Sequence, residues 1–242
     1  MNVLRDILNT VTVDATVTDV RICLRATMVV SQHLGLSYTF PLGMCEGRAD
    51  PHKTVNNCGS LTGMSAMQLA RYALSDDWTE ASVGVAAINS LITPDPKQIT
   101  SINGVDILLE RAAGAKVAMV GHFPFSDKIK EVAKELCILE LRPDKGDLDA
   151  SEASRVIPKV DVVIVTGTTL INHTFENIAE MAKKSYMMLL GPTTILSPVL
   201  FDYGADAICG VRVVDPALTI RHLSEGGSFR RIQGTEQIAL LK

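Results

Sequence analysis

Five short apolar runs recur at regular intervals in the second half of the chain, and they restrict its fold more than any other feature. They are KVAMVG from residue 116, LCILEL from 136, DVVIVTG from 161, YMMLLG from 186 and DAICGV from 206. The segments between them have helix-like spacing or helix-starting residues. Continuous apolar strands that alternate with helices are typical of a parallel sheet covered on both faces. Residues 99–242 are therefore predicted to form a doubly wound, Rossmann-like α/β domain.

Before these runs, apolar residues recur along the chain with different spacings. Residues 1–11 carry apolar side chains on one helical face, whereas residues 17–40 are rich in β-branched residues between polar and glycine breaks. This pattern predicts a helix and then an antiparallel meander of about three strands. The other expected elements are helices at 65–74 and 78–92, the second lined with small residues, and a proline-containing linker at 93–101. Residues 1–98 are thus predicted to be an α+β domain.

Charge and hydropathy limit the classes of function. The chain has 23 basic and 27 acidic residues, with no basic run of the kind that neutralises phosphates. We therefore expect no nucleic-acid partner. The N-terminus lacks the features of a signal peptide, and no stretch approaches the roughly 18 apolar residues of a membrane span. We expect a soluble, cytoplasmic protein without membrane contact that forms a homo-oligomer, a dimer.

The strand ends are the expected place for a ligand, because open α/β sheets bind ligands outside the carboxyl ends of their strands. The candidates there are Gly121, His122 and Pro124 after the first strand, Glu140 after the second, Thr166, Gly167, Thr168 and Thr169 after the third, and Gly191, Pro192 and Thr193 after the fourth. Small and hydroxyl residues predominate, which leaves the backbone open to a ligand. His122 follows the first strand directly and is expected to touch a ligand, a metal or a proton in transit.

The first turn resembles a nucleotide-binding turn only in part. Glu140 lies nineteen residues after Gly121, close to the spacing of the acid that binds a ribose in dinucleotide folds. The turn itself reads GHFPFS rather than GxGxxG, so Phe123 adds bulk and Pro124 removes a backbone N–H where a pyrophosphate needs donors. Ordinary NAD binding is not expected, whereas a nucleotide-like or adenosyl ligand stays open.

The third turn, TGTTLINHTFENI at 166–178, has the densest group of hydroxyls. Asn172 or Thr174 is expected to cap the following helix, with Glu176 in its first turn. The hydroxyls and the free helix terminus together predict a site for an anion or polar ligand. His173 would lie beside it, either as a ligand contact or as a surface or capping residue.

Two loops carry metal-binding residue types. Cys45, His52 and Cys58 share one loop, although their spacing matches no established zinc finger, so a glycine-rich loop at a cleft is the alternative. Asp147 lies among three acids of the loop RPDKGDLDA, which is either a source of carboxylate ligands or simply solvated. Cys137 and Cys209 lie inside apolar runs, and we expect them to pack as small hydrophobic residues.

Four ordered motifs resemble the DUF364 family of heavy-metal chelation domains. They are VGHFPF, LELRPDKGD, DVVIVTGTTLINHTFENI and LLGPTTILSPVLFDYGADAICGVRVVD. Residues 17–93 are similar to the usual N-terminal companion of this family, the DUF4213 domain. The resemblance implies an N-terminal domain shaped like that of enolase, a Rossmann-like domain without the GxGxxG signature, and a cleft between them as the active site.

The resemblance also implies site residues. Carried over by position, His122, Glu140, Asp147 and Asn172 are expected to act in the chemistry, and Gly121, Pro124, Thr166, Gly167, Thr168, Thr174, Gly191, Pro192 and Thr193 to contact the ligand. The metal candidates are His122, Glu140 and Asp147, with Cys45, His52 and Cys58 as the weaker set. Relatives often have GPS where this chain has Gly191-Pro192-Thr193, which keeps the hydroxyl.

Three functions follow from these observations. The first is handling of a transition-metal ion with a small chelating ligand in the cleft. The second is an enzyme or sensor for a nucleotide-like or S-adenosyl ligand at the strand ends, with Glu140 on a ribose. The third is a non-catalytic scaffold in a homo-oligomer.

Overall fold

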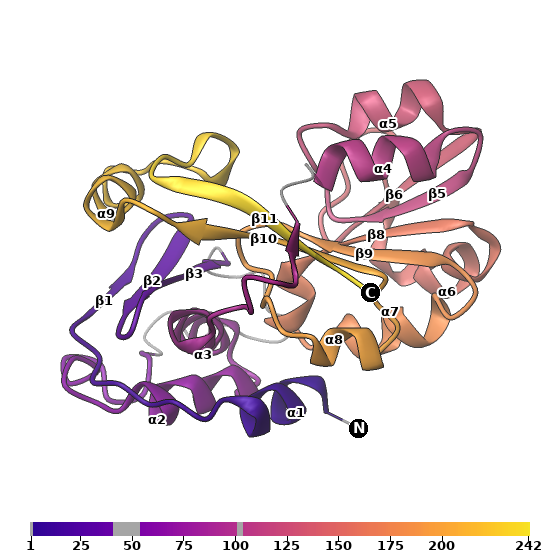
Figure 1. Ribbon diagram of the computed structural model, residues 1–242. Helices are drawn as coiled ribbons and strands as arrows, with labels where there is room; N and C mark the ends of the chain where they lie inside the picture. The colour runs from indigo at the N-terminus through magenta and orange to yellow at the C-terminus, as the bar shows by residue number, and fades with distance from the viewer. Residues whose placement is uncertain (1, 41–53, 101–103) are drawn as a thin grey trace.

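The computed structural model describes residues 2–40, 54–100 and 104–242, and it contains two sheets (Figure 1). The N-terminal sheet is an antiparallel meander in the order β1-β2-β3, as the sequence predicts. The elements of this half are α1 (Val3–Thr10), β1 (Asp19–Ile22), β2 (Ala26–Val30), β3 (Leu34–Tyr38), α2 (Ala66–Ala70), the 3-10 helix η1 (Arg71–Leu74) and α3 (Trp78–Leu91). Strands followed by helices confirm the expected α+β arrangement.

Helix α3 forms the centre of the N-terminal half because its backbone touches other backbone on two sides. A Cβ atom added to Gly84 would lie 1.8 Å from the backbone nitrogen of Ala73 in η1. On the other side, a Cβ atom on Gly35 of β3 would lie 2.0 Å from the carbonyl oxygen of Ala86 in α3. Glycine alone permits these two approaches, because any side chain would need the space of a backbone atom.

The C-terminal half is an eight-stranded sheet in the order β4-β11-β10-β9-β8-β5-β6-β7. Its strands are β4 (Ile99–Thr100), β5 (Lys116–Val120), β6 (Glu135–Glu140), β7 (Leu148–Asp149), β8 (Val162–Thr166), β9 (Tyr186–Leu190), β10 (Ala207–Val213) and β11 (Thr235–Leu241). Its helices are α4 (Gly104–Ala112), α5 (Ser126–Val132), η2 (Ala150–Glu152), α6 (Ala153–Val156), η3 (Ile157–Lys159), η4 (Gly167–Leu170), α7 (Phe175–Met181), α8 (Val199–Asp202), α9 (Pro216–Ser224) and η5 (Phe229–Arg231). The helices α4 and α5 cover one face and α6, α7 and α8 the other (Figure 1).

All five predicted strands are present, and they are parallel. The sequence did not reveal β4, β7 and β11. Strand β4 falls in the expected linker, where it pairs with β11 at the edge of the sheet. Since β4 and β7 have only two residues each, they carry no periodic signal.

The order of the parallel strands places one crevice in the sheet. Counted along the chain from β5 to β10, the strands lie in the order 3-2-1-4-5-6, which is the order of dinucleotide-binding folds. The connections diverge between β5 and β8, so the ends of these two strands border the point where such sheets bind ligands.

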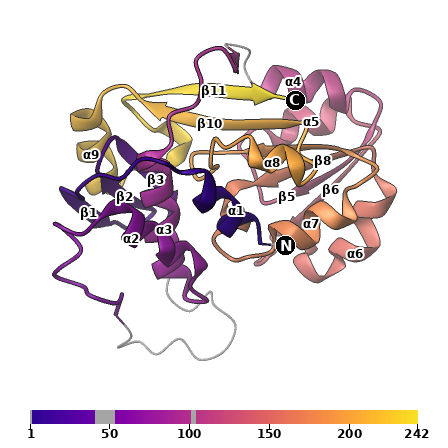
Figure 2. The ribbon, with the colours of Figure 1, turned by 60° about the horizontal axis from the view of Figure 1, so that its bottom comes forward.

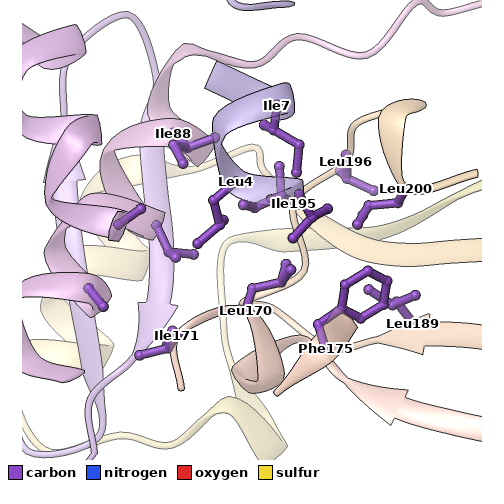
Figure 3. Packing of buried hydrophobic residues seen from close by; sticks show 14 of the residues in the cluster. Leu4, Ile7, Ile88, Leu170, Ile171, Phe175, Leu189, Ile195, Leu196 and Leu200 are labelled. Carbon is purple, nitrogen blue, oxygen red and sulfur yellow. The ribbon is translucent and has the colours of Figure 1, made fainter. Parts of the chain in front are cut away.

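The two halves share one hydrophobic core. Figure 3 shows Leu4 and Ile7 of α1 between Ile88 of α3 and the residues Leu170, Ile171, Phe175, Leu189, Ile195, Leu196 and Leu200 of the larger half. Figure 2 shows α1 lying between the smaller half and helices α7 and α8. Hydrogen bonds reinforce the junction: the N–H of Val3 donates to Glu176 at 2.5 Å, and the Tyr203 hydroxyl donates to Asp6 at 2.6 Å. No helix in the described part of the chain is long and apolar enough to span a membrane.

Truncation of this shared core has a measurable cost. Ile7 is fully buried, so we expect Ile7→Ala to lower the free energy of unfolding by about 2–5 kcal/mol. Because both halves pack on α1, the loss should appear in a single transition followed by circular dichroism. Asn9→Ala, at an exposed position of the same helix, is the control and should change stability little. A second transition that stays unchanged in Ile7→Ala would contradict the shared core.

Candidate functional site

A cavity of about 740 Å³ lies where the two halves meet the ends of β5, β6, β8 and β9. From the larger half it is lined by the turn after β5, the end of β6, the threonine turn after β8 and residues 190–193. Arg25, Tyr38 and Phe40 of the smaller half and residues 228–230 near η5 complete the wall. The cavity therefore occupies the crevice that the strand order defines.

Most of the predicted site residues meet at this cavity. Those that line it are Gly121, His122, Pro124, Glu140, Thr166, Thr168, Asn172, Thr174, Gly191, Pro192 and Thr193. Asp147 and Gly167 do not line it. At Gly167 an added Cβ would lie 2.5 Å from the backbone nitrogen of Thr194, so glycine permits this close approach of the third and fourth turns. Asp147 is instead hydrogen-bonded to His122, which lines the cavity.

The turn after β5 is held by Glu140. The carboxylate of Glu140 accepts a hydrogen bond from the backbone N–H of His122 at 2.6 Å and one from Leu141 at 3.2 Å. Gly121 makes this turn with a φ of 96°, and an added Cβ would lie 2.9 Å from Cγ2 of Thr166 on the neighbouring strand. Glu140 thus positions the first turn, in addition to lining the cavity.

The imidazole of His122 is engaged at both nitrogens. Its Nδ1 lies 3.3 Å from Oδ2 of Asp147, and its Nε2 lies 3.2 Å from the hydroxyl of Ser126. The side chain of Asp147 is only 6% exposed, whereas that of His122 is 40% exposed and lines the cavity. A carboxylate only accepts hydrogen bonds, so Nδ1 donates to Asp147, and in the neutral imidazole Nε2 then accepts from Ser126.

The threonine turn is organised by bonds among its own side chains. Oγ1 of Thr166 accepts from the N–H of Thr168 at 3.4 Å and from its hydroxyl at 3.1 Å. Oδ1 of Asn172 accepts from the hydroxyl of Thr174 at 2.7 Å. The expectation that Asn172 or Thr174 caps α7 is wrong, because Thr174 is the N-cap residue but has helical φ and ψ, and no side chain bonds to the first-turn amides there.

The fourth turn and His173 face the smaller half. The hydroxyl of Thr193 accepts a hydrogen bond from the N–H of Tyr38 at 2.9 Å, so this residue joins the halves as well as lining the cavity. His173 has a φ of 57°, and its Nε2 donates to the carbonyl oxygen of Ser75 at 2.9 Å. It lines a separate pocket of about 230 Å³ beside α1. Of the two histidines, His122 is therefore the one at the large cavity.

Among the residues that the structure describes, the histidine, cysteine and acidic side chains do not form a set of metal ligands. No group of three or more His, Cys, Asp or Glu side chains in residues 2–40, 54–100 and 104–242 is placed to hold a metal. Cys45 and His52 lie outside the described residues, and Cys58 is exposed and does not line the cavity. Cys209 is 5% exposed, and burial raises the pKa of its thiol to about 12, as expected for a thiol that packs in the core.

A positively charged and aromatic wall was missed by sequence reasoning. Arg25 precedes β2, Arg230 lies in η5, and neither guanidinium has a hydrogen bond or ion-pair partner among the described residues. Four of the eleven aromatic residues line the cavity, namely Tyr38, Phe40, Phe123 and Phe229. Arg25 and Arg230 are far apart in the sequence and follow no shared motif, so only the fold brings them to one cavity.

Comparison with known proteins places the chain in a family. Residues 103–242 match the family model DUF364 and residues 5–92 the model DUF4213, both described as "Putative heavy-metal chelation". The chain belongs to the DUF364 family. A DUF364 protein of unknown function from Desulfitobacterium hafniense DCB-2 has a crystal structure with a TM-score of 0.84 at 24% identity, covering 99% of this chain and 97% of that chain. A DUF364 protein of unknown function from Pyrococcus horikoshii gives a TM-score of 0.81 at 19% identity, covering 100% and 98%.

A curated relative shows a similar likeness in sequence. An uncharacterized protein of Methanocaldococcus jannaschii is 28% identical over 171 residues, which are 67% of this chain and 66% of that protein. The chain thus spans about two thirds of the length of this relative. The DUF364 structures share the fold, and the DUF364 model points to metal-related chemistry without naming a ligand.

Proposed function

We propose that the cavity binds a small anionic organic ligand that carries a transition-metal ion, so that the protein handles metal as a chelate. The observation that carries this proposal is that Arg25 and Arg230 line the same cavity as the hydroxyl-rich turns and that neither guanidinium has a hydrogen-bond or ion-pair partner among the described residues. Arginine recognises carboxylates and phosphates through paired N–H donors. The volume of about 740 Å³ lies within the usual range for small-molecule sites.

The remaining polar groups suit the same ligand. Thr166 and Asn172 offer a hydroxyl and an amide N–H to the oxygens of a chelator. His122, held by Asp147, can take up a proton that a chelating group loses when it binds metal. In this view the organic ligand and the metal are cargo.

The test uses Ni(II)–citrate and Fe(III)–citrate as probes in titration calorimetry. Because a hydrogen bond to a charged group is worth about 1.5–3 kcal/mol, Arg25→Gln and Arg230→Gln should each weaken chelate binding about 10-fold or more. Arg231→Gln is the matched control, since Arg231 is adjacent to Arg230 but does not line the cavity. Tighter binding of free Ni²⁺ than of its citrate complex, or equal affinities in all variants, would contradict the proposal.

A nucleoside ligand is the second candidate, favoured by the strand order 3-2-1-4-5-6 and by Glu140 at the end of β6. Leu141 beside it lines the cavity and is 40% exposed, so it offers an apolar surface to a base. We expect this ligand class to raise Tm in a screen of nucleosides, nucleotides and S-adenosyl compounds, and Glu140→Gln to abolish the rise. The exposed Glu131→Gln is the control. Stabilisation by metal chelates alone would exclude this candidate.

A further inference from the structure

Ser126, His122 and Asp147 form a continuous chain of hydrogen bonds at the wall of the cavity. The Ser126 hydroxyl lies 3.2 Å from Nε2 of His122, and Nδ1 of the same ring lies 3.3 Å from Asp147. Asp147 is itself held, because Oδ2 accepts the backbone N–H of Asp144 at 3.2 Å. With the N–H of His122 bonded to Glu140, both the backbone and the ring of the histidine are fixed.

This arrangement has the parts that an activated serine requires. A serine hydroxyl is a weak nucleophile until a base lies within hydrogen-bond reach, and the base works best when a third group fixes its orientation and tautomer. His122 is that base, because Asp147 keeps the proton on Nδ1 and leaves Nε2 to accept from Ser126. Such units are recognised by geometry and not by order along the chain.

The structure also explains why these residues meet. His122 leaves the carboxyl end of β5, and Ser126 begins α5 four residues later, so the turn of Phe123 and Pro124 folds the serine back toward the imidazole. Phe123 and Pro124 line the cavity, whereas Ser126 is 7% exposed and does not line it. The serine touches the cavity wall through its contact with the ring of His122, which is 40% exposed.

We propose that Ser126 is a nucleophile that hydrolyses an ester bound in the cavity, with His122 as its general base and Asp147 as the positioning residue. Oγ of Ser126 forms a bond to the ester carbonyl carbon while its proton passes to Nε2 of His122. The bond from that carbon to the leaving oxygen breaks, and this oxygen takes the proton from Nε2. Water then repeats the sequence on the acyl-serine, so ester and water become acid and alcohol. The inference uses the proposed cavity but neither of its arginines.

The experiment combines a fluorophosphonate probe with p-nitrophenyl acetate hydrolysis. In the wild-type protein, mass spectrometry should find the adduct on the peptide that contains Ser126. Ser126→Ala should abolish both signals, and His122→Gln should lower the hydrolysis rate about 100-fold or more. Ser60→Ala, at an exposed serine that does not line the cavity, is the control and should keep the wild-type rate.

The positioning role of Asp147 has its own readout. Asp147→Asn should lower kcat about 100-fold with KM nearly unchanged, because the carboxylate acts on the transition state and not on substrate binding. Circular dichroism and Tm of each variant verify folding. An adduct absent from Ser126 in the wild-type protein, or hydrolysis that persists in Ser126→Ala, overturns the proposal. Arg25→Gln and Arg230→Gln should retain labelling, which separates this result from a failure of the chelate proposal.

Discussion

Gly84→Ala is expected to leave the N-terminal half unable to fold stably. The new Cβ would lie 1.8 Å from the backbone nitrogen of Ala73 and 2.4 Å from the carbonyl carbon of Tyr72. Ordinary overpacking costs about 1–3 kcal/mol because side chains and backbone shift to make room. Here the obstacle is the backbone of η1, which cannot rotate away as a side chain can. We therefore expect a loss above that range, in a protein whose total stability is on the order of 5–15 kcal/mol.

Gly104→Ala is the matched control, since Gly104 is also a helical glycine with a close neighbour. Its nearest atom is Sγ of Cys209 at 2.9 Å, which belongs to a side chain that can move. Thermal unfolding should therefore show a large loss of Tm, or insoluble protein, for Gly84→Ala and a small change for Gly104→Ala. Similar Tm values for the two variants would refute the close packing of α3.

Gly121→Ala is expected to disturb the cavity itself. Gly121 has a φ of 96°, where a side chain costs about 1–3 kcal/mol, and its Cβ would also meet Cγ2 of Thr166 at 2.9 Å. The collision should push apart the ends of β5 and β8 and misplace His122. We expect lower stability together with a loss of chelate binding.

Two further variants isolate the collision from the backbone strain. Gly146 has a φ of 105°, but an added Cβ would meet nothing within 4 Å, so Gly146→Ala carries the strain alone. In the double variant Gly121→Ala/Thr166→Ser the colliding methyl group is removed, and part of the stability should return. Calorimetry and ligand titration of the three proteins measure both effects. A double variant as impaired as Gly121→Ala would show that contact with Thr166 is not the cause.

The sequence predicted the parallel sheet well because each buried strand is a continuous apolar run, a signal that needs no tertiary context. It also predicted that His122 follows β5, at the edge where ligands bind. The partners of His122 were harder to predict. Ser126 begins a helix after a proline turn, and its contact with the imidazole depends on the angle at which that turn folds back.

The other misses have the same physical origin. Arg25 and Arg230 reach one cavity from opposite ends of the chain, so no local pattern relates them. The cap of α7 was predicted from residue type alone, but capping depends on the backbone conformation of Thr174. Local sequence patterns indicate which residues are buried and whether they form a helix or a strand. The cavity instead depends on tertiary contacts between segments that are far apart in the sequence.

The two family regions pack into a single folded unit, because they share one hydrophobic core through α1. If residues 99–242 were expressed alone, the surface around Leu170, Phe175 and Leu200 would face water and invite aggregation. The smaller half would lose its cover in the same way. A gene that encoded only one region would therefore need another protein to replace the missing face. Attempts to split the chain, exchange one region or permute its ends should preserve α1 and its docking surface intact.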